Sequence, residues 1–414
     1  MANGDAKIEE VRLDIRQAAD MFDGEIELLK MAQLDSLAPI EAWTAIGTNM
    51  QLSYATHGAF RYFGKFPPPV ATYLIEEYSS QDEWVYDFMS GSGTTGVEAL
   101  LLNRNCLLND VNPLSVLLAK VKTTKLDIQS MKKAVDSVVE RYRPLSVEEY
   151  NFVPVGLRDP DHFFLKETSD SLRGLKAAIE QEEDANLRDF LTVAFLSCVR
   201  RVSRATTQQG RLFLDVETAE PNALPLFVKR AEILINGISN LPSSEMLPVI
   251  TSFDIKEGVP SDRSGAAALV ILHPPYFNSY KYSGVNSLEL GWLGEERKAF
   301  NKSEIREFFK VGKAKNAPKY IDDMVETIEK ATEALRPGGH LALMIGDTRI
   351  KGEYIPVTRG VIDRLSNKLV LEKVALRVPK YTEASWAASQ RRGSSQVGVA
   401  LCDFILVFRK EQHG

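Results

Sequence analysis

The sequence has few cysteines, no long apolar run and no excess of positive charge. Its three cysteines (Cys106, Cys198 and Cys402) stand far apart, which excludes a disulfide-rich secreted domain and a zinc ribbon. No apolar stretch approaches the roughly 18 residues that a membrane span needs. The first ten residues also lack the apolar core of a signal peptide. We therefore expect a cytoplasmic protein that does not contact a membrane.

The composition is that of an ordinary globular protein. Of the 414 residues, 44% are hydrophobic and 26% are charged, and this length suits two or three domains. The formal net charge is −6. Any contact with nucleic acid must therefore come from local basic patches rather than from the overall charge.

A glycine-rich turn follows a short apolar segment in Trp84-Val-Tyr-Asp-Phe-Met-Ser-Gly-Ser-Gly-Thr-Thr-Gly96. The pattern predicts a strand that ends at Asp87, a tight turn through Gly91 and Gly93, and a helix that begins near Thr94. Such a turn at the carboxyl end of a parallel strand is typical of nucleotide-like ligand sites in open α/β sheets. An ordinary strand-to-helix turn is the alternative.

A second strand ends in an acid at the spacing that a ribose site requires. Asn105-Cys-Leu-Leu-Asn-Asp110 places Asp110 23 positions after Asp87. An acid about 20 residues along, at the end of the next strand, can accept hydrogen bonds from ribose hydroxyls. Asn112-Pro113 then begins another helix. Together with the glycine turn, this spacing favours a nucleoside-binding site.

Further apolar segments alternate with helical patterns and predict an α/β fold, a Rossmann-like, seven-stranded, mostly parallel sheet. The expected strands are 84–87, 105–110, 247–254, 266–272, 340–346, 369–377 and 401–408. A helical spacing over residues 8–35 predicts an N-terminal helical segment within residues 1–50. The sheet domain would comprise residues 51–122 and 246–414. Residues 123–245 would form a helical insertion, with helices near 129–142, 165–183, 186–204 and 221–238.

The fourth strand ends abruptly in His273-Pro-Pro-Tyr276. The two prolines stiffen the turn and fix its direction. A rigid aromatic ring beside a polar acceptor suits a flat heterocycle that carries an amino group, such as a base that has left the duplex. A simple strand terminator is the alternative.

These motifs resemble those of the DNA amino-methyltransferases, which methylate N4 of cytosine or N6 of adenine with S-adenosyl-L-methionine. Asp87-Phe-Met-Ser-Gly-Ser-Gly-Thr-Thr95 is similar to the family's cofactor motif, with Phe88-Met89 in place of Pro-Phe. The segment from His57 to Pro68, with its Gly-Lys-Phe-Pro core, resembles the second cofactor motif. His273-Pro-Pro-Tyr276 matches the catalytic tetrapeptide, whose first residue is usually Asp, Asn or Ser.

The resemblance implies a class I methyltransferase that acts at a defined DNA sequence, with N4 of cytosine favoured over N6 of adenine. The implied catalytic residues are His273, Pro274, Pro275 and Tyr276. The implied cofactor residues, taken with the strand-end positions, are Lys65, Phe66, Pro67, Asp87, Phe88, Met89, Gly91, Ser92, Gly93, Thr94, Thr95, Asp110, Asn112 and Asp254.

In the mechanism that we expect, the flipped base stacks on Tyr276. His273 and the carbonyl of Pro274 accept hydrogen bonds from the exocyclic amine while the methyl group transfers in line. Neutral imidazole can accept such a bond and imidazolium cannot, so activity should fall as the pH drops through the ordinary histidine pKa of about 6.5. The alternative is that His273 faces away and the backbone alone binds the amine.

Double-stranded DNA is the expected partner, and basic side chains are the expected contacts. The candidates are Arg200, Arg201, Arg204, Arg211, Lys313, Lys315, Arg391 and Arg392. Each could instead belong to a solvated face. Base recognition is expected in the insertion or in residues 277–320.

Two other functions stay open. The first is an RNA amino-methyltransferase with the same catalytic geometry, and the second is an inactive methyltransferase fold that binds nucleic acid. A cognate restriction or defence component, as in a restriction-modification system, is also left open.

Overall fold

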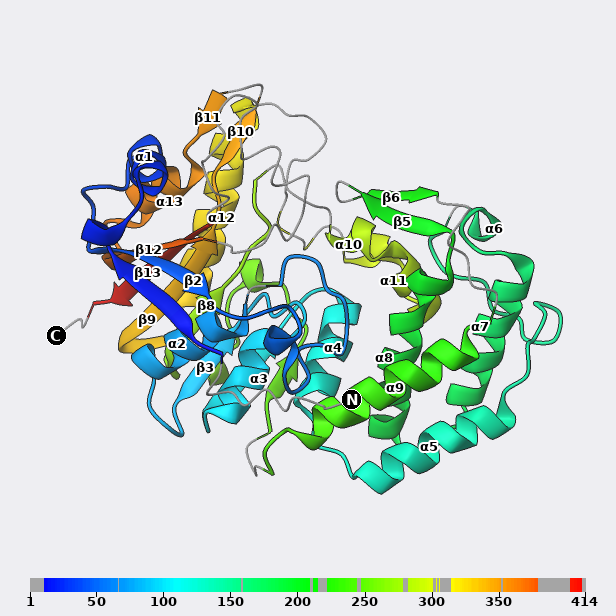
Figure 1. Ribbon diagram of the computed structural model, residues 1–414. Helices are drawn as coiled ribbons and strands as arrows, with labels where there is room; N and C mark the ends of the chain where they lie inside the picture. Colours follow the sequence, from blue (N-terminus) through cyan, green and yellow to red (C-terminus); the bar gives the residue numbers. More distant parts are fainter. Residues whose placement is uncertain are drawn as a thin grey trace.

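The computed structural model describes residues 11–65, 67–157, 159–208, 211–214, 222–243, 247–277, 282–300, 303, 305, 314–350, 353–378 and 403–411. These residues form a lobe built on a large β-sheet and a second lobe made mostly of helices (Figure 1). Within these ranges, no helix combines the length and the apolar character that crossing a membrane requires.

A nine-stranded sheet forms the first lobe, in the order β1-β2-β12-β13-β9-β8-β3-β4-β7. β13 runs antiparallel to both of its neighbours and β1 runs antiparallel to β2, whereas all other neighbours are parallel. The strands are β1 (Leu13–Gln17), β2 (Ile40–Ala45), β3 (Trp84–Asp87), β4 (Asn105–Asn109), β7 (Val249–Thr251), β8 (Ala267–Leu272), β9 (Leu335–Ile345), β12 (Leu369–Arg377) and β13 (Asp403–Lys410).

The mostly parallel, Rossmann-like α/β sheet is confirmed, but the expected count of seven strands is too low. The seven expected strands are present, and β1 and β2 extend the sheet beyond β12. The single N-terminal helix expected over residues 8–35 is also wrong, because the described residues of this range form β1, a short 3-10 helix (Ala18–Asp20) and α1 (Asp23–Met31). Leu13 and Ile15 fit a helical spacing, but they also alternate with polar residues, and this period of two pairs with β2.

The order of the strands reverses between β3 and β8. After β3, the chain adds β4 and then β7 on one side, and it returns to add β8 and β9 on the other side. Such a switch point opens a crevice at the carboxyl ends of the central strands, where open α/β sheets bind their ligands. The carboxyl ends of β3 and β8 carry the glycine turn and the His273 tetrapeptide, respectively.

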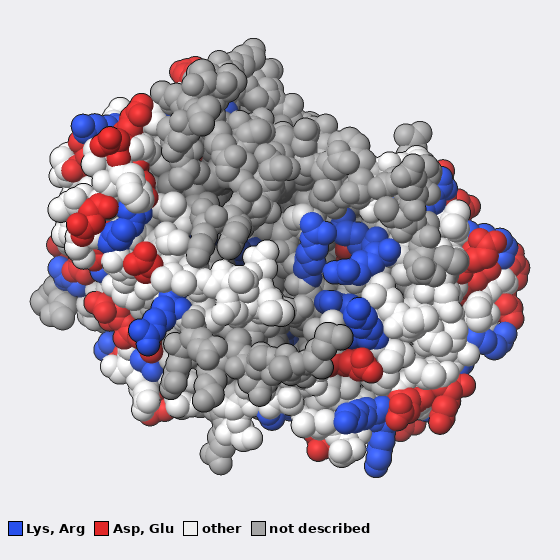
Figure 2. Space-filling view, viewed as in Figure 1, with Lys and Arg blue, Asp and Glu red and all other residues white. Residues whose placement is uncertain are grey.

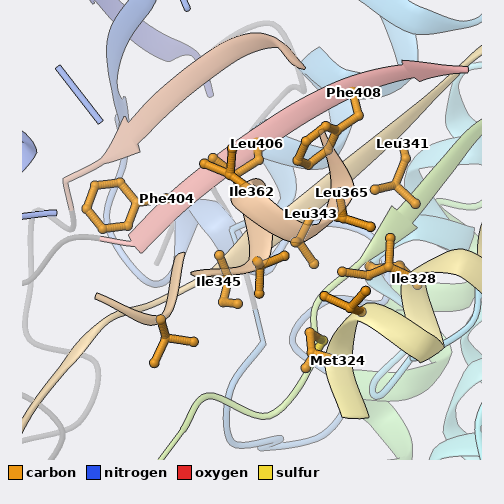
Figure 3. Close-up of a cluster of buried hydrophobic side chains, with 14 of the residues drawn as sticks. Met324, Ile328, Leu341, Leu343, Ile345, Ile362, Leu365, Phe404, Leu406 and Phe408 are labelled. Atoms are coloured by element: carbon orange, nitrogen blue, oxygen red, sulfur yellow. The ribbon is translucent and has the colours of Figure 1, made fainter. Parts of the chain in front are cut away.

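Helices cover both faces of the sheet (Figure 1). On one face, α12 (Ala317–Thr332) and α13 (Val357–Leu365) pack against β9 and β13, where Leu, Ile and Phe side chains interdigitate (Figure 3). On the other face, α2 (Pro68–Tyr78) and α3 (Thr94–Leu101) pack against the strand side chains that point away from α12 and α13. Burial of each large apolar side chain stabilises the fold by about 1.5–3 kcal/mol. The sheet is therefore a rigid support for the loops at its edge.

The helical lobe has its own core, which includes the buried side chain of Trp292. The four helices expected in the insertion are present to within a few residues, and a hairpin of β5 and β6 follows α8. α11, which the expected division placed with the sheet, packs on α8 instead. The elements after α3, besides the strands of the large sheet, are α4 (Pro113–Thr123), α5 (Ile128–Arg141), α6 (Pro160–Phe163), α7 (Lys166–Ile179), α8 (Ala185–Val202), β5 (Ala205–Gln208), β6 (Arg211–Leu214), α9 (Leu224–Ser239), α10 (Tyr282–Val285), α11 (Ser287–Leu293), β10 (Thr348–Ile350) and β11 (Glu353–Ile355).

Candidate active site

The turn between β3 and α3 depends on its glycines. Gly91 has φ +50° and Gly93 has φ +76°, in the left-handed region that glycine adopts without strain. A Cβ atom on Gly93 would lie 3.0 Å from the Cα atom of Ala119 in α4. Both the backbone conformation and the close approach of α4 therefore require glycine at this position.

Asp87 ends β3 and holds the two ends of the turn together. Its Oδ1 accepts a hydrogen bond from the Met89 amide at 3.0 Å, and its Oδ2 accepts one from Thr95 Oγ1 at 2.6 Å. Burial raises the pKa of Asp87 to about 7, although these two hydrogen bonds oppose the rise. Both carboxylate oxygens are therefore used in shaping the turn.

Asp110 joins the same turn to the loop that follows β4. Its Oδ2 accepts from the Gly91 amide at 2.8 Å, and its Oδ1 accepts from the Asn112 amide at 2.9 Å. Burial raises the pKa of Asp110 to about 6, against the lowering effect of these backbone bonds. The side chain stays partly exposed, so its carboxylate can meet a ligand.

These residues surround a cavity at the switch point of the sheet, which encloses about 930 Å³ together with its open mouth. Eight of the expected cofactor residues line it, namely Lys65, Phe88, Met89, Gly91, Ser92, Thr94, Asp110 and Asn112. Five do not line it, namely Pro67, Asp87, Gly93, Thr95 and Asp254. Phe66 lies outside the described residues. Asp254 caps a short 3-10 turn by accepting from the Lys256 amide at 3.1 Å.

Sequence reasoning missed an aromatic and amide wall of the cavity. Phe253, next to Asp254, lines it and packs edge-on against Phe88 at 6.0 Å between ring centroids. Asn109 holds this wall in place, because its side chain accepts from the Phe253 amide at 2.9 Å and donates to the Phe253 carbonyl at 3.0 Å. In the sequence, only the position of Asn109 indicates a role in the site, because Asn109 directly precedes Asp110 at the end of β4.

The tetrapeptide reaches the same cavity from β8. His273 and Pro275 line it, whereas Pro274 and Tyr276 do not. His273 Nε2 lies 3.1 Å from Tyr276 Oη, and the Pro275 carbonyl accepts from Tyr320 Oη at 2.6 Å. The Tyr276 ring is 8% exposed and packs in the core beneath the sheet edge. The glycine turn, Asp110 and the histidine therefore face one space.

Comparison with known proteins finds similarity to DNA methyltransferases over part of the chain. Residues 35–120, which contain the glycine turn and Asp110, match the model of a DNA methylase family. Over 269 residues, the chain is 25% identical to the type II methyltransferase M.MvaI of Kocuria varians, covering 59% of each chain. It is 32% identical over 90 residues to the type II methyltransferase M.MjaII of Methanocaldococcus jannaschii, covering 22% of this chain and 17% of that one. In these segments the chain is similar to the DNA amino-methyltransferase family. It spans less than two thirds of the length of these relatives.

The similarity to solved structures is weak. The rRNA methyltransferase aviRa of Streptomyces viridochromogenes aligns over 88% of this chain and 94% of its own, with 10% identity and a TM-score of 0.30. A structure titled PH0851 aligns over 98% of this chain and 60% of its own, with 12% identity and a TM-score of 0.30. Likenesses at this level add nothing to the fold described above.

The similarity to these methyltransferases implies S-adenosyl-L-methionine as the methyl donor, and the cavity suits that molecule. Ser90 Oγ and Asn112 Nδ2 are buried in its wall and have no hydrogen-bond partner among the described residues. A buried polar atom without a partner is costly, and a polar ligand would satisfy both. Asp110 offers a carboxylate, and Phe88 and Phe253 offer apolar ring surface. The residues present therefore fit a nucleoside that carries positive charge.

A strap of residues 54–65 covers part of the cavity through Tyr62 and Lys65. It is anchored by the fully buried Glu98 of α3. Glu98 Oε1 accepts from Tyr54 Oη at 2.8 Å and lies 2.6 Å from His57 Nε2, and its Oε2 accepts from Thr72 Oγ1 at 2.7 Å.

The protonation of this anchor follows from its burial. Burial raises the pKa of Glu98 to about 7. Burial, followed by the charges of Lys122 and Lys65, lowers the pKa of His57 well below its ordinary value. Neutral His57 therefore donates from Nε2 to Glu98.

Replacing Glu98 by alanine should loosen this strap, because the buried His57 loses its partner and the half-buried Tyr54 loses its acceptor. We expect Glu98→Ala to lower the free energy of unfolding by about 2 kcal/mol or more, since a buried group without a partner costs about 1–3 kcal/mol. Denaturant titration measures this change. Glu140→Ala, at an exposed position of α5, is the control and should be near neutral. A Glu98→Ala protein as stable as the control would contradict the anchoring role.

The arginines and lysines that the sequence predicts to contact nucleic acid differ in their exposure and in their partners. Arg200 forms an ion pair with Glu289 of α11. Its Nε and one Nη donate to the two carboxylate oxygens of Glu289 at 2.9 and 2.8 Å. Arg201 and Lys315 are exposed, and Arg204 is partly buried. Arg211 begins β6, but its side chain lies outside the described part of the chain. Lys313, Arg391 and Arg392 also lie outside it.

Proposed function

We propose that this protein transfers a methyl group from S-adenosyl-L-methionine to the exocyclic amine of a base flipped out of double-stranded DNA, with N4 of cytosine the favoured target. The observation that carries the proposal is that His273 and Pro275 line the same cavity as the glycine turn and Asp110. The similarity to two type II methyltransferases supports DNA as the substrate.

In this proposal, the bound donor supplies an electrophilic methyl group, and the protein supplies position. Asp110 accepts hydrogen bonds from ribose hydroxyls with the lone pairs that its backbone partners leave. Ser90 and Asn112 bind further polar atoms of the donor, and the Phe253 ring packs against its base. Lys65, whose Nζ donates to the His57 carbonyl at 2.9 Å, closes the cavity from the strap. Holding both reactants in line supplies much of the rate acceleration.

His273 acts on the amine of the target base. When Nε2 carries the proton and donates to Tyr276 Oη, Nδ1 carries the lone pair that can accept from the amine. A hydrogen bond from the amine localises the nitrogen lone pair that attacks the methyl group. The Tyr276 hydroxyl can accept from Nε2 in this tautomer, in addition to the stacking role expected from the sequence. Stacking of a base on Tyr276 requires its ring to turn out of the core.

Two alternatives keep their place beside this proposal. An RNA amino-methyltransferase would use the same cavity with a different nucleic acid. An inactive methyltransferase fold would bind the donor and nucleic acid without transfer. A role in a restriction-modification system would require a cognate nuclease.

A methyl-transfer assay separates the proposal from its alternatives. The full chain is incubated with donor labelled in the methyl group and with duplex DNA, single-stranded DNA or RNA of mixed sequence. The proposal predicts label in duplex DNA above all. Label confined to RNA would select the RNA alternative, and binding of the donor without any transfer would select the inactive fold.

The buried acids predict a pH dependence of donor binding. The pKa of Asp110 is raised to about 6 and that of Asp87 to about 7. The donor carries positive charge and hydroxyl donors, so it favours ionised Asp110. Affinity should therefore be highest above pH 7 and fall on the order of tenfold by pH 5, as Asp110 takes up a proton.

Isothermal titration calorimetry of the donor alone measures this dependence, without nucleic acid. Below pH 6, binding should also release protons, which buffers of different ionisation enthalpy reveal. An affinity that stays constant from pH 5 to pH 8, with no proton release, would contradict an ionised Asp110 in the complex.

A further inference from the structure

Three arginines without a carboxylate partner surround the junction of the strap with α8 and α9. Arg61 lies in the strap next to Tyr62, Arg201 ends α8, and Arg230 lies in α9. No ion pair involves any of the three among the described residues, whereas neighbouring Arg200 is paired with Glu289. Figure 2 shows Lys and Arg side chains gathered near the middle of one face, between the two lobes.

Two of these arginines contact the strap, in which Arg61 itself lies two residues after Ala59. Arg230 donates to the Ala59 carbonyl at 2.5 Å, and the Arg61 guanidinium lies 5.1 Å from the Phe63 ring centroid. Arg200 lies 5.8 Å from the same ring. Burial, with the charge of Arg201 second, lowers the pKa of Arg230. The charges of Arg201 and Arg230 are therefore close enough to repel each other, and Arg230 contacts the strap two residues before Arg61.

Neighbouring positive charges destabilise the protein unless an anion binds to them. The repulsion costs stability in the free protein, and Arg230 Nε is buried with no hydrogen-bond partner among the described residues. The protein as a whole has a net charge of −6, so general attraction cannot hold a polyanion here. Arginine suits phosphate in particular, because its planar group donates two parallel hydrogen bonds.

We propose that Arg61, Arg201 and Arg230 grip the phosphates of duplex DNA beside the target nucleotide. The assignment rests on the proposed function, and it adds Arg61 and Arg230 to the contacts expected from the sequence. Arg61 precedes Tyr62, which lines the cavity, so a phosphate held by Arg61 lies next to the cavity. The strap thereby couples the backbone contact to the cavity that receives the base.

The test measures binding of the full chain to a short fluorescein-labelled duplex of mixed sequence by fluorescence anisotropy at several salt concentrations. Arg61→Ala and Arg201→Ala should each weaken binding roughly threefold to tenfold and should each reduce the slope of log K against log salt by about 0.9. Arg201→Ala is the second variant because the side chain of Arg201 is exposed, so that its removal should disturb the fold little. Arg141→Ala removes the same charge from an exposed site on α5 and is the matched control.

The outcomes separate this surface from the proposed activity. A loss of affinity and of salt slope in both variants, but not in the control, supports the phosphate contacts even if no methyl transfer occurs. Variants that bind duplex DNA like the wild type would overturn the proposal even if transfer is robust. Loss of binding to a single-stranded RNA probe, with no binding of duplex DNA by any form, would overturn DNA as the partner.

Discussion

Replacing His273 by leucine should lower the rate of methyl transfer by roughly 100-fold to 1,000-fold, the usual effect of removing one preorganised hydrogen-bonding group from a transition state. His273 lines the cavity and lies 3.1 Å from Tyr276 Oη, so it is placed to accept from the amine. Affinity for the donor should change little, because the proposed partner of His273 is the target base. Single-turnover transfer to duplex DNA, with calorimetry of the donor, separates the two effects.

Restoring an acceptor tests the chemistry of this position. His273→Asn places the residue type that the family often carries before Pro-Pro-Tyr, and its amide oxygen accepts the same hydrogen bond. We expect transfer to return to within about tenfold of the wild type. With the donor held at saturation, so that the Asp110 effect on affinity is removed, the loss of activity at low pH should disappear. His340→Asn is the control, since His340 begins the central part of β9 and does not line the cavity. Equal activity of His273→Leu and the wild type would assign the amine to the backbone alone.

Replacing Asp110 by asparagine should weaken donor binding by about 100-fold or more, since each hydrogen bond to a charged group contributes about 1.5–3 kcal/mol. The substitution removes the charge that meets the ribose hydroxyls. It also places an amide nitrogen against the amide of Gly91 or Asn112, which now donate to the carboxylate at 2.8 and 2.9 Å. The glycine turn should therefore loosen as the affinity falls.

Calorimetry of the donor measures this effect, and Asp127→Asn is a matched control. Asp127 also accepts a backbone hydrogen bond, from Ser130 at 2.7 Å, but it caps α5 and does not line the cavity. The control should bind the donor like the wild type. An Asp110→Asn protein of unchanged affinity would remove Asp110 from the proposed ribose site.

The sequence was sufficient to predict the parts of the site that local rules determine. A positive φ demands glycine at Gly91 and Gly93, and an acid at the end of the next strand has a fixed place relative to that turn. The buried apolar segments likewise predicted the strands that bring His273 to the cavity. These features depend on residues that are close in sequence or on the general geometry of parallel strands.

The remainder depends on tertiary packing, which local patterns do not determine. Phe253 rather than Asp254 lines the cavity, because Asn109 holds the backbone of this segment. The sequence suggests Arg200 as a DNA contact, but in the fold its guanidinium pairs with Glu289 of α11. The spacing of Leu13 and Ile15 also fits a helix, but in the fold this segment pairs with β2 as a strand. In each case, the contact that decides the structure is made by a residue distant in the sequence, and local patterns do not reveal it.

The most direct test of the central claim is the identity of the product. The full chain is incubated with S-adenosyl-L-methionine and duplex DNA of mixed sequence, and the DNA is digested to nucleosides for mass spectrometry. We predict N4-methylcytosine, with N6-methyladenine the lesser product, and loss of the product in His273→Leu. DNA without a methylated exocyclic amine, from a protein that calorimetry shows to bind the donor, would contradict the claim that this cavity joins donor and base.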